Sequence, residues 1–180
     1  MTDCVRPARP EDASCLAALA SLVWLDTYAS AGIRPALARH VQASFTPQVF
    51  LDKLADPQQH ILLLERDGHL LAYALLQVGA VCPGEPAWQA ELVTLYVMPR
   101  FAGQGLGSRL LSASLQLAGQ LGYPGLWLSV FHGNQRALGF YRHLGLQQGA
   151  DCFFELEGER HLNHVFLLPY SGEGNHVALQ

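Results

Sequence analysis

The sequence predicts a single α/β domain with a mixed central sheet of about six to seven strands and helices on both faces. First, half of its 180 residues are hydrophobic, which is enough for one sizeable core. Second, strand-like and helix-like apolar segments alternate in the order β-α-α-β-β-β-α-β-α-β-β. Third, a strand, a helix and a strand follow one another in the middle, as in a parallel crossover. We expect this domain to span residues 1–170, followed by a mobile polar tail over 171–180.

The first third of the chain predicts one short strand and two helices. A strand is expected over 4–8, and a helix opens at Pro10 with two acidic residues in its first turn. On this helix Trp24 and Tyr28 lie four residues apart, where they either pack in the core or line a substrate pocket. The segment 31–35 breaks the helical pattern. Thr46 and Pro47 then mark the N-cap and first residue of a second helix.

The middle of the chain predicts a hairpin. Strands are expected over 60–66 and 69–78, joined by the tight turn Asp67-Gly68. The proline- and glycine-containing segment 79–90 is expected to be a loop.

Strands and helices alternate in the second half. We expect strands over 91–97, 126–130, 152–157 and 162–168. One helix of about 15 residues is expected from Gly107, and a second helix over 135–144. Gly145 is the expected C-cap of the last helix.

Three glycines at alternate positions, Gly103, Gly105 and Gly107, connect a strand directly to a helix. Such a turn exposes backbone N–H groups at the positive end of a helix, which suits a pyrophosphate. A nucleoside-triphosphate loop would need a lysine before Ser108, where Gly107 stands. A dinucleotide site would need a different glycine spacing and a downstream acid, but residues 123–131 contain no Asp or Glu. A tight turn that binds no ligand is the remaining alternative.

Composition narrows the function class. A net charge of −4 gives no basic field for nucleic acid. Four cysteines without CxxC spacing indicate reduced thiols, and no apolar run approaches the roughly 18 residues of a membrane span, so we expect a cytoplasmic protein without a membrane partner. His161 and His164 fall on a predicted strand, where their spacing points them to opposite faces. No metal site is therefore expected.

A second motif follows the buried strand 126–130. Residues 134–146 read Asn-x-x-Ala-x-x-Phe-Tyr-x-x-Leu-Gly-Leu. Together with the glycine turn, this segment resembles the coenzyme A signature of the GNAT acyltransferase superfamily. The resemblance implies a GNAT-like fold and an N-acetyltransferase that uses acetyl-CoA as co-substrate. The acetyl group would pass to an amine of a small molecule or peptide by direct attack, without an acyl-enzyme. The resemblance also allows a homodimer.

The resemblance implies a set of cofactor-binding residues. The strand 91–97 would separate from the strand 126–130, so that the backbone of Leu95, Tyr96 and Val97 receives the pantetheine. The turn residues would hold the pyrophosphate: Ala102, Gly103, Gln104, Gly105, Leu106, Gly107 and Ser108. Ala102 departs from the Arg or Gln that the family usually has there. Arg100 fits that position only if the motif is aligned two residues earlier, on Gly103 and Gly105. It could still reach a phosphate as a cation.

The catalytic residues are also implied by the resemblance. Tyr141 matches the general acid that protonates the departing thiolate, and the alternative is a half-buried packing residue next to a core Phe140. Glu91 is the candidate base. In the alternative interpretation Glu91 is only an exposed acid at the start of the strand, and a water chain takes the proton from the amine. A backbone N–H near Leu95 or Tyr96 would stabilise the oxyanion. Asn134 would contact the cofactor, or would serve only as an N-cap.

A second class of function remains open. The substitution at Ala102 and the uncertain base allow a CoA-binding regulatory module with little or no catalysis.

Overall fold

The computed structural model describes residues 3–156 and 159–172. Its seven strands are hydrogen-bonded in the order β1-β2-β3-β4-β5-β7-β6, which confirms the predicted mixed sheet. β4 and β5 run parallel, whereas β1–β2, β5–β7 and β6–β7 are antiparallel. Part of the expected tail, 173–180, and the last residue of the predicted strand 152–157 lie outside the described residues.

The bounds of the elements follow the chain order. They are β1 (Asp3–Pro7), η1 (Pro10–Asp12), α1 (Ala13–Tyr28), α2 (Pro35–Ser44), α3 (Pro47–Ala55), β2 (Gln59–Arg66), β3 (His69–Val78), β4 (Ala90–Val97), η2 (Pro99–Phe101), α4 (Leu106–Gln120), β5 (Gly125–Phe131), α5 (Gln135–His143), β6 (Gln147–Leu156) and β7 (Glu159–Pro169).

The chain forms two compact units, and its assignment to one domain stays a prediction. The first unit contains residues up to Leu76 together with Thr94–Ala113, and the second contains Gln77–Val93 with the residues from Ser114 onward. The first therefore holds the glycine turn, whereas Glu91, Asn134 and Tyr141 all belong to the second.

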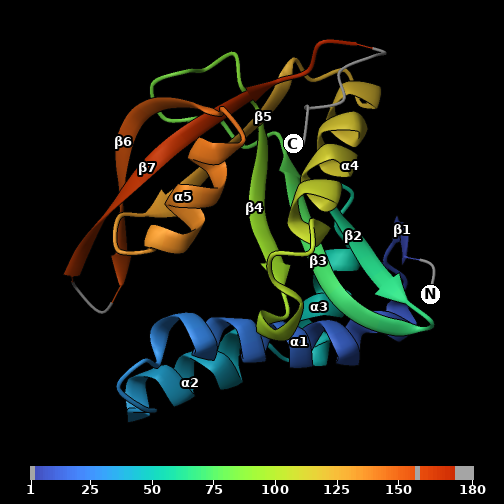
Figure 1. Ribbon diagram of the computed structural model, residues 1–180, viewed down its shortest axis with the longest axis vertical. Coiled ribbons are helices and arrows are strands. Elements are labelled where there is room, and N and C mark those ends of the chain that lie inside the picture. Colours follow the sequence, from blue (N-terminus) through green and yellow to red (C-terminus); the bar gives the residue numbers. More distant parts are fainter. Residues whose placement is uncertain (1–2, 157–158, 173–180) are drawn as a thin grey trace. The chain divides into compact units, whose positions relative to one another are not determined.

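The core of the first unit lies between α1, α3 and the strands. α1 and α3 lie side by side (Figure 1). Leu16 and Ala20 of α1 are fully enclosed against Phe50 of α3, Leu63 of β2 and Tyr73 of β3. Leu16 and Ala20, four residues apart, therefore lie on one buried face of α1.

One helix was not predicted. The sequence predicts that Pro35 belongs to a segment that breaks the helical pattern. In the structure α2 starts at Pro35, which occupies the first turn of the helix, where proline is well tolerated. No residue of α2 is fully buried. The first helix also begins later than predicted, at Ala13, because residues 10–12 form a 3-10 turn.

Local turn chemistry is confirmed at two positions. Asp67 and Gly68 both have left-handed backbones, with φ of 50° and 76°, as a type I′ hairpin turn requires. The Thr46 hydroxyl accepts a hydrogen bond from the Val49 N–H at 3.2 Å, which caps α3.

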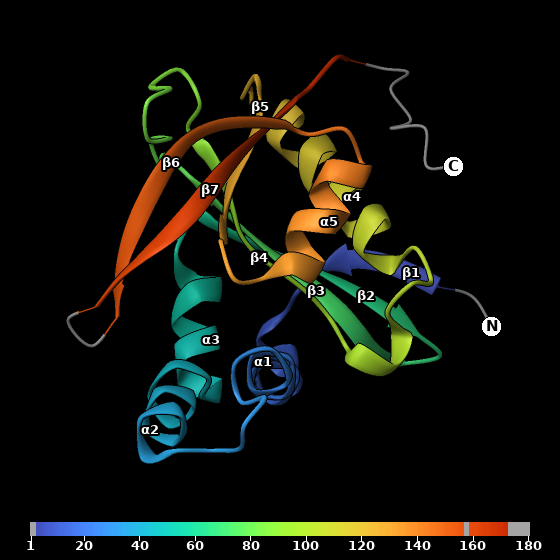
Figure 2. The same ribbon diagram turned by 60° about the vertical axis from the view of Figure 1, so that its left-hand side comes forward.

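The second unit is built on β5, β7 and β6. β6 and β7 form a long antiparallel pair, and α5 lies along it in both views (Figure 2). Trp127 of β5 packs with Val165 and Leu167 of β7 and with Cys82. The Trp127 indole also donates to the Ala80 carbonyl at 2.8 Å, which ties the loop before β4 to β5.

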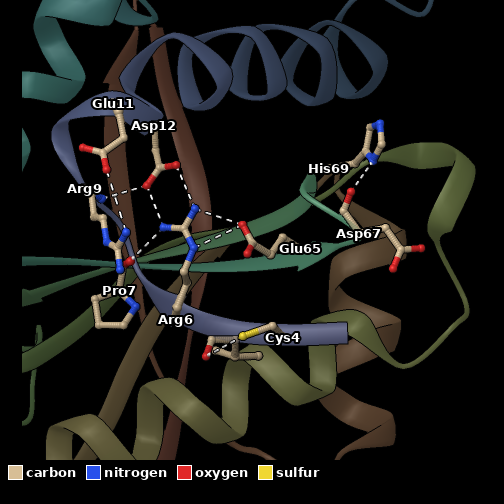
Figure 3. Close-up of polar contacts among 10 residues, drawn as sticks. Cys4, Arg6, Pro7, Arg9, Glu11, Asp12, Glu65, Asp67 and His69 are labelled. Carbon is tan, nitrogen blue, oxygen red and sulfur yellow. Dashed lines mark hydrogen bonds and ion pairs between the residues drawn. The ribbon is translucent and has the colours of Figure 1, made fainter. Parts of the chain in front are cut away.

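An ion cluster joins β1, η1 and β2 in the first unit (Figure 3). The Arg6 guanidinium donates two hydrogen bonds to Asp12, at 2.7 and 2.9 Å, and two to one Glu65 oxygen, at 2.9 and 3.1 Å. Asp12 also accepts from the Arg9 backbone N–H at 2.8 Å. The Arg6 side chain lowers the pKa of the Asp12 carboxyl. The cluster therefore holds the start of α1 on the edge of the sheet.

We expect Arg6→Met to lower the free energy of unfolding by about 2 kcal/mol, because it leaves two partly buried carboxylates unpaired. Arg9→Met is the matched control, because the Arg9 side chain is exposed and its contact to Glu11 is 3.9 Å long. The Asp12 pKa is lowered on folding, so its contribution is present above the unfolded pKa and is lost as the pH falls. Denaturant unfolding at neutral and acidic pH measures both effects. Equal losses for the two variants would contradict the assignment.

Candidate functional site

The glycine turn forms an open cradle of backbone N–H groups. Gly103 and Gly105 have φ of 77° and 75°, a left-handed conformation that glycine adopts without strain. A Cβ built on either would have nothing within 4 Å, so both glycines face open space. α4 begins at Leu106, one residue earlier than predicted, and its first helical hydrogen bond runs from Arg109 N–H to the Gly105 carbonyl. The preceding N–H groups of the turn therefore suit a pyrophosphate.

Both sides of this cradle are anchored to the first two strands. Arg109, in the first turn of α4, pairs with Asp3 of β1 at 2.6 Å. Arg66 of β2 pairs with the same carboxylate at 2.6 Å, and its guanidinium lies 6.0 Å from the Phe101 ring. Arg100 is exposed, whereas Ala102 is partly buried. The cradle is thus held from both ends, although Ala102 supplies no side-chain donor.

The strand residues expected to hold pantetheine are partly buried in the first unit: Leu95, Tyr96 and Val97. The Tyr96 ring meets the Tyr73 ring edge-on at 5.6 Å. Burial, followed by the nearby Tyr28, raises the pKa of Tyr96. The structure therefore brings Tyr28 near the strand predicted to bind the cofactor.

Trp24 and Tyr28 differ in burial, and the expectation that they line a substrate pocket stays a prediction. Trp24 is 8% exposed and packs in an aromatic cluster, whereas Tyr28 is 41% exposed. The Trp24 ring stacks on His40 at 4.4 Å and contacts Tyr28 at 4.8 Å. His40 and Phe45 also touch each other in this cluster; both were missed because α2 was missed.

Asn134 caps α5. Its side-chain oxygen accepts from the Ala137 N–H at 3.1 Å, which is the N-cap alternative. The cap occupies the oxygen and not the amide donors, so a cofactor contact through Nδ2 stays a prediction.

Tyr141 is the buried aromatic of α5. It is 8% exposed and its ring lies 5.9 Å from that of Phe166 on β7. Burial raises its pKa, and its hydroxyl bonds to no other described residue. The expectation that Phe140 is the core residue is wrong: Phe140 is partly exposed, because Leu138 and Tyr141, three residues apart, define the buried face.

Glu91 and Tyr141 lie on opposite faces of the sheet. Glu91 is opposite Trp127 in the parallel β4–β5 pair, and Trp127 is opposite Leu167 of β7. Tyr141 contacts Phe166, the residue before Leu167, so it covers the other face. Glu91 is partly buried, and this burial raises its pKa.

A hydrogen-bonded chain not predicted from the sequence lies on the Tyr141 face. Nδ1 of the buried His164 lies 2.7 Å from an Asp151 oxygen, and its Nε2 lies 2.8 Å from Nδ1 of His132. His161 lies on the opposite face, where its ring meets Phe131 at 5.7 Å. The sequence pattern of His161 and His164 bears only on a metal site and does not indicate this chain. Within residues 3–156 and 159–172 no cluster suits a metal ion.

The described residues also contain no helix long and apolar enough to span a membrane.

The chain is similar to known acetyltransferases. The acetyltransferase (GNAT) family model matches residues 17–146. An uncharacterized N-acetyltransferase of Mycobacterium tuberculosis is 32% identical over 132 residues, covering 73% of this chain and 80% of that protein. The N-alpha-acetyltransferase RimI of the same species is 34% identical over 104 residues, covering 57% and 61%. A Thermoplasma acidophilum N-acetyltransferase solved with coenzyme A aligns with a TM-score of 0.72 at 19% identity, covering 91% and 98%.

Proposed function

Because this chain belongs to the acetyltransferase (GNAT) family, we propose that it moves an acetyl group from acetyl-CoA to an amine by direct attack, without an acyl-enzyme. The observation that carries this function is the open left-handed turn at Gly103 and Gly105, which leads into the start of α4. Relatives found by comparison are named N-acetyltransferases, which supports nitrogen as the acceptor atom.

We assign the proton transfers to two side chains of the second unit. A protonated amine cannot attack a thioester, so the Glu91 carboxylate takes its proton, directly or through water. Backbone N–H groups near Leu95 or Tyr96 stabilise the oxyanion as the amine adds. Tyr141 then donates its phenol proton to the departing thiolate, which leaves coenzyme A as the free thiol. The second proton that the amide nitrogen loses returns through water to the Tyr141 phenolate, and the proton on Glu91 passes to solvent. Burial raises the pKa of Glu91, which makes its carboxylate a stronger base, and it raises the pKa of Tyr141, which keeps the phenol protonated.

The cradle residues hold the diphosphate through main-chain donors. Gly103, Gly105 and the first residues of α4 supply N–H groups, and the helix dipole adds to their attraction for an anion. Asp3 and Arg109 keep this turn in place from β1.

We expect acetyl-CoA to raise the melting temperature of the wild-type protein and Gly105→Ala to remove most of that increase. Alanine at Gly105 is strained in a left-handed backbone and adds a Cβ beside the phosphates. Gly68→Ala is the matched control, because Gly68 has φ of 76° and the same open surroundings but lies in the β2–β3 hairpin. The strain costs both variants about 1 kcal/mol of stability.

Thermal shift with acetyl-CoA, with NAD and ATP as comparison ligands, measures the effect. No response of the wild-type protein to acetyl-CoA would overturn the proposed function. An equal loss of the acetyl-CoA shift in both glycine variants would instead remove the turn from the binding site.

A further inference from the structure

A buried histidine joins two exposed side chains on the Tyr141 face of the second unit. His164 of β7, which is 9% exposed, lies between Asp151 of β6 and His132, the residue that follows β5. Phe166 is two residues after His164 on the same strand, so both point to the same side, and the Phe166 ring contacts that of Tyr141. The three side chains therefore lie on the sheet face that α5 covers (Figure 2).

The hydrogen bonds of this chain determine which nitrogens carry protons. An ionised carboxylate only accepts, so Nδ1 of His164, 2.7 Å from the Asp151 oxygen, carries a proton and donates it. The Gln148 amide lies farther from the same nitrogen, at 3.2 Å, and can turn its oxygen toward that proton. In a neutral imidazole the other nitrogen is an acceptor, so Nε2 of His164 accepts at 2.8 Å from Nδ1–H of His132. His132 thus serves the chain as a donor.

His132 connects β7 to the start of α5 through its backbone as well. Its N–H donates to the Leu162 carbonyl of β7 at 2.8 Å. Its carbonyl accepts from the side chain of Gln135, the first residue of α5, at 2.8 Å. The imidazole adds the bond to His164. Asn134, which caps α5, is two residues further along, so the position of the α5 N-terminus depends on His132.

Burial of His164 gives the bond between the two imidazoles its importance. A buried acceptor without a donor is costly, so His164 Nε2 favours the arrangement in which the His132 imidazole lies against β7. The charge-assisted bond to Asp151 holds the His164 ring from its other side. Asp151 thus orients His164, and His164 orients His132.

We propose that His164 is a positioning residue for Tyr141, and that it acts by holding His132 and the first turn of α5 against β7. The inference rests on the proposed acetyl transfer, in which Tyr141 is the acid. Tyr141 lies about two helical turns beyond Asn134 on the buried face of α5. A proton donor must stay within hydrogen-bond reach of the departing thiolate, so a displacement of about 1 Å at the start of the helix lowers the rate. The three side chains of the chain transfer no proton in the reaction.

The tautomers are tested in the wild-type protein without any need for turnover. Long-range ¹H–¹⁵N spectra distinguish a protonated ring nitrogen from a bare one. The signals of each histidine are identified by their loss in His132→Asn and His164→Phe. At about pH 8, where an ordinary imidazole is neutral, both His132 and His164 should be protonated at Nδ1 and bare at Nε2. A bare Nδ1 on His132 would overturn the proposal.

The position of Tyr141 is tested by ¹⁹F NMR of protein labelled with 3-fluorotyrosine. The Tyr141 and Tyr123 signals are identified by their loss in Tyr141→Phe and Tyr123→Phe. His132→Ala and His164→Phe each remove the bond between the two imidazoles and should shift or broaden the Tyr141 signal. His132→Asn should keep this signal close to wild type, because its amide nitrogen takes the place of Nδ1 and donates to His164. The Tyr123 signal, from the turn before β5, should not move in any of these variants.

Thiol release with propylamine as acceptor tests the consequence for catalysis. His132→Ala should lower kcat about tenfold, and His132→Asn should restore it to within about twofold of the wild type. His132→Ala combined with His164→Phe should be no worse than either change alone, because both break the same bond. Two independent packing losses would instead add up in the double variant.

The outcomes separate this inference from the proposed function. A Tyr141 signal that stays in place in both His132→Ala and His164→Phe would overturn the positioning role. Equal effects of His132→Ala and His132→Asn would also overturn it, because they would assign the role to the ring and not to its donor. A displaced Tyr141 signal with an unchanged kcat would support the positioning role and count against Tyr141 as the acid. Without turnover of propylamine the ¹⁹F signals decide, and if His132→Ala does not fold, His164→Phe and the wild-type tautomers decide.

Discussion

Tyr141→Phe is expected to lower kcat by about tenfold or more while the affinity for acetyl-CoA stays close to that of the wild type. The change removes the proton donor but keeps the ring, so the packing of residue 141 against Phe166 persists. The hydroxyl bonds to no other described residue, so its removal should not lower the melting temperature. A loss of kcat without a loss of stability distinguishes an acid from a packing residue.

The pH profile adds a second test of Tyr141. Burial raises its pKa, so the phenol keeps its proton beyond the ordinary value of about 10. Tyr141 should therefore cause no fall in kcat between neutral pH and that value. Tyr123→Phe removes a phenol hydroxyl from the same unit and is the control. An unchanged kcat in Tyr141→Phe would remove the acid assignment and favour a regulatory CoA-binding module.

The parts of the site that depend on short segments could be predicted from the sequence. Left-handed backbones at Gly103 and Gly105, the cap at Asn134 and the turn at Asp67-Gly68 each depend on residues only a few positions apart. Such local chemistry leaves a readable pattern.

Contacts between distant segments could not be predicted in the same way. The chain from Asp151 to His164 depends on a register shift between Gln148 and Asp151, which no local pattern encodes. The phase of α5 was misjudged because two adjacent aromatics, Phe140 and Tyr141, fit an inward position equally well.

The placement of Glu91 illustrates the same limit. Its position at the start of a strand could be predicted, but its face could not, because strand register decides which side chains share a side. Only the pairings Glu91–Trp127 and Trp127–Leu167 show that Glu91 and Tyr141 are on opposite faces.

Glu91→Gln is expected to lower kcat/KM for an amine about tenfold or more and to raise the melting temperature at neutral pH. The two effects have one cause. Burial raises the Glu91 pKa, so folding favours the protonated carboxyl. That contribution is fully present below the unfolded pKa and is lost as the pH rises through the folded pKa. At neutral pH the ionised carboxylate therefore destabilises the fold, and a neutral glutamine does not.

The pH dependence of both quantities separates a base from a structural acid. The wild-type rate should rise with pH through the raised pKa of Glu91, and this limb should be absent in Glu91→Gln. The gain in melting temperature should vanish below about pH 4, where the wild-type carboxyl is also neutral. Glu85→Gln, at an exposed loop position of the same unit, should change neither quantity.

A retained rate in Glu91→Gln would assign proton removal to water, whereas a lower melting temperature at neutral pH would show that the carboxylate stabilises the fold. A fully solvated carboxylate would be too weak a base to take a proton from an ammonium. Burial raises the pKa of the carboxyl and so strengthens the base, and the cost is a lower stability of the fold at neutral pH.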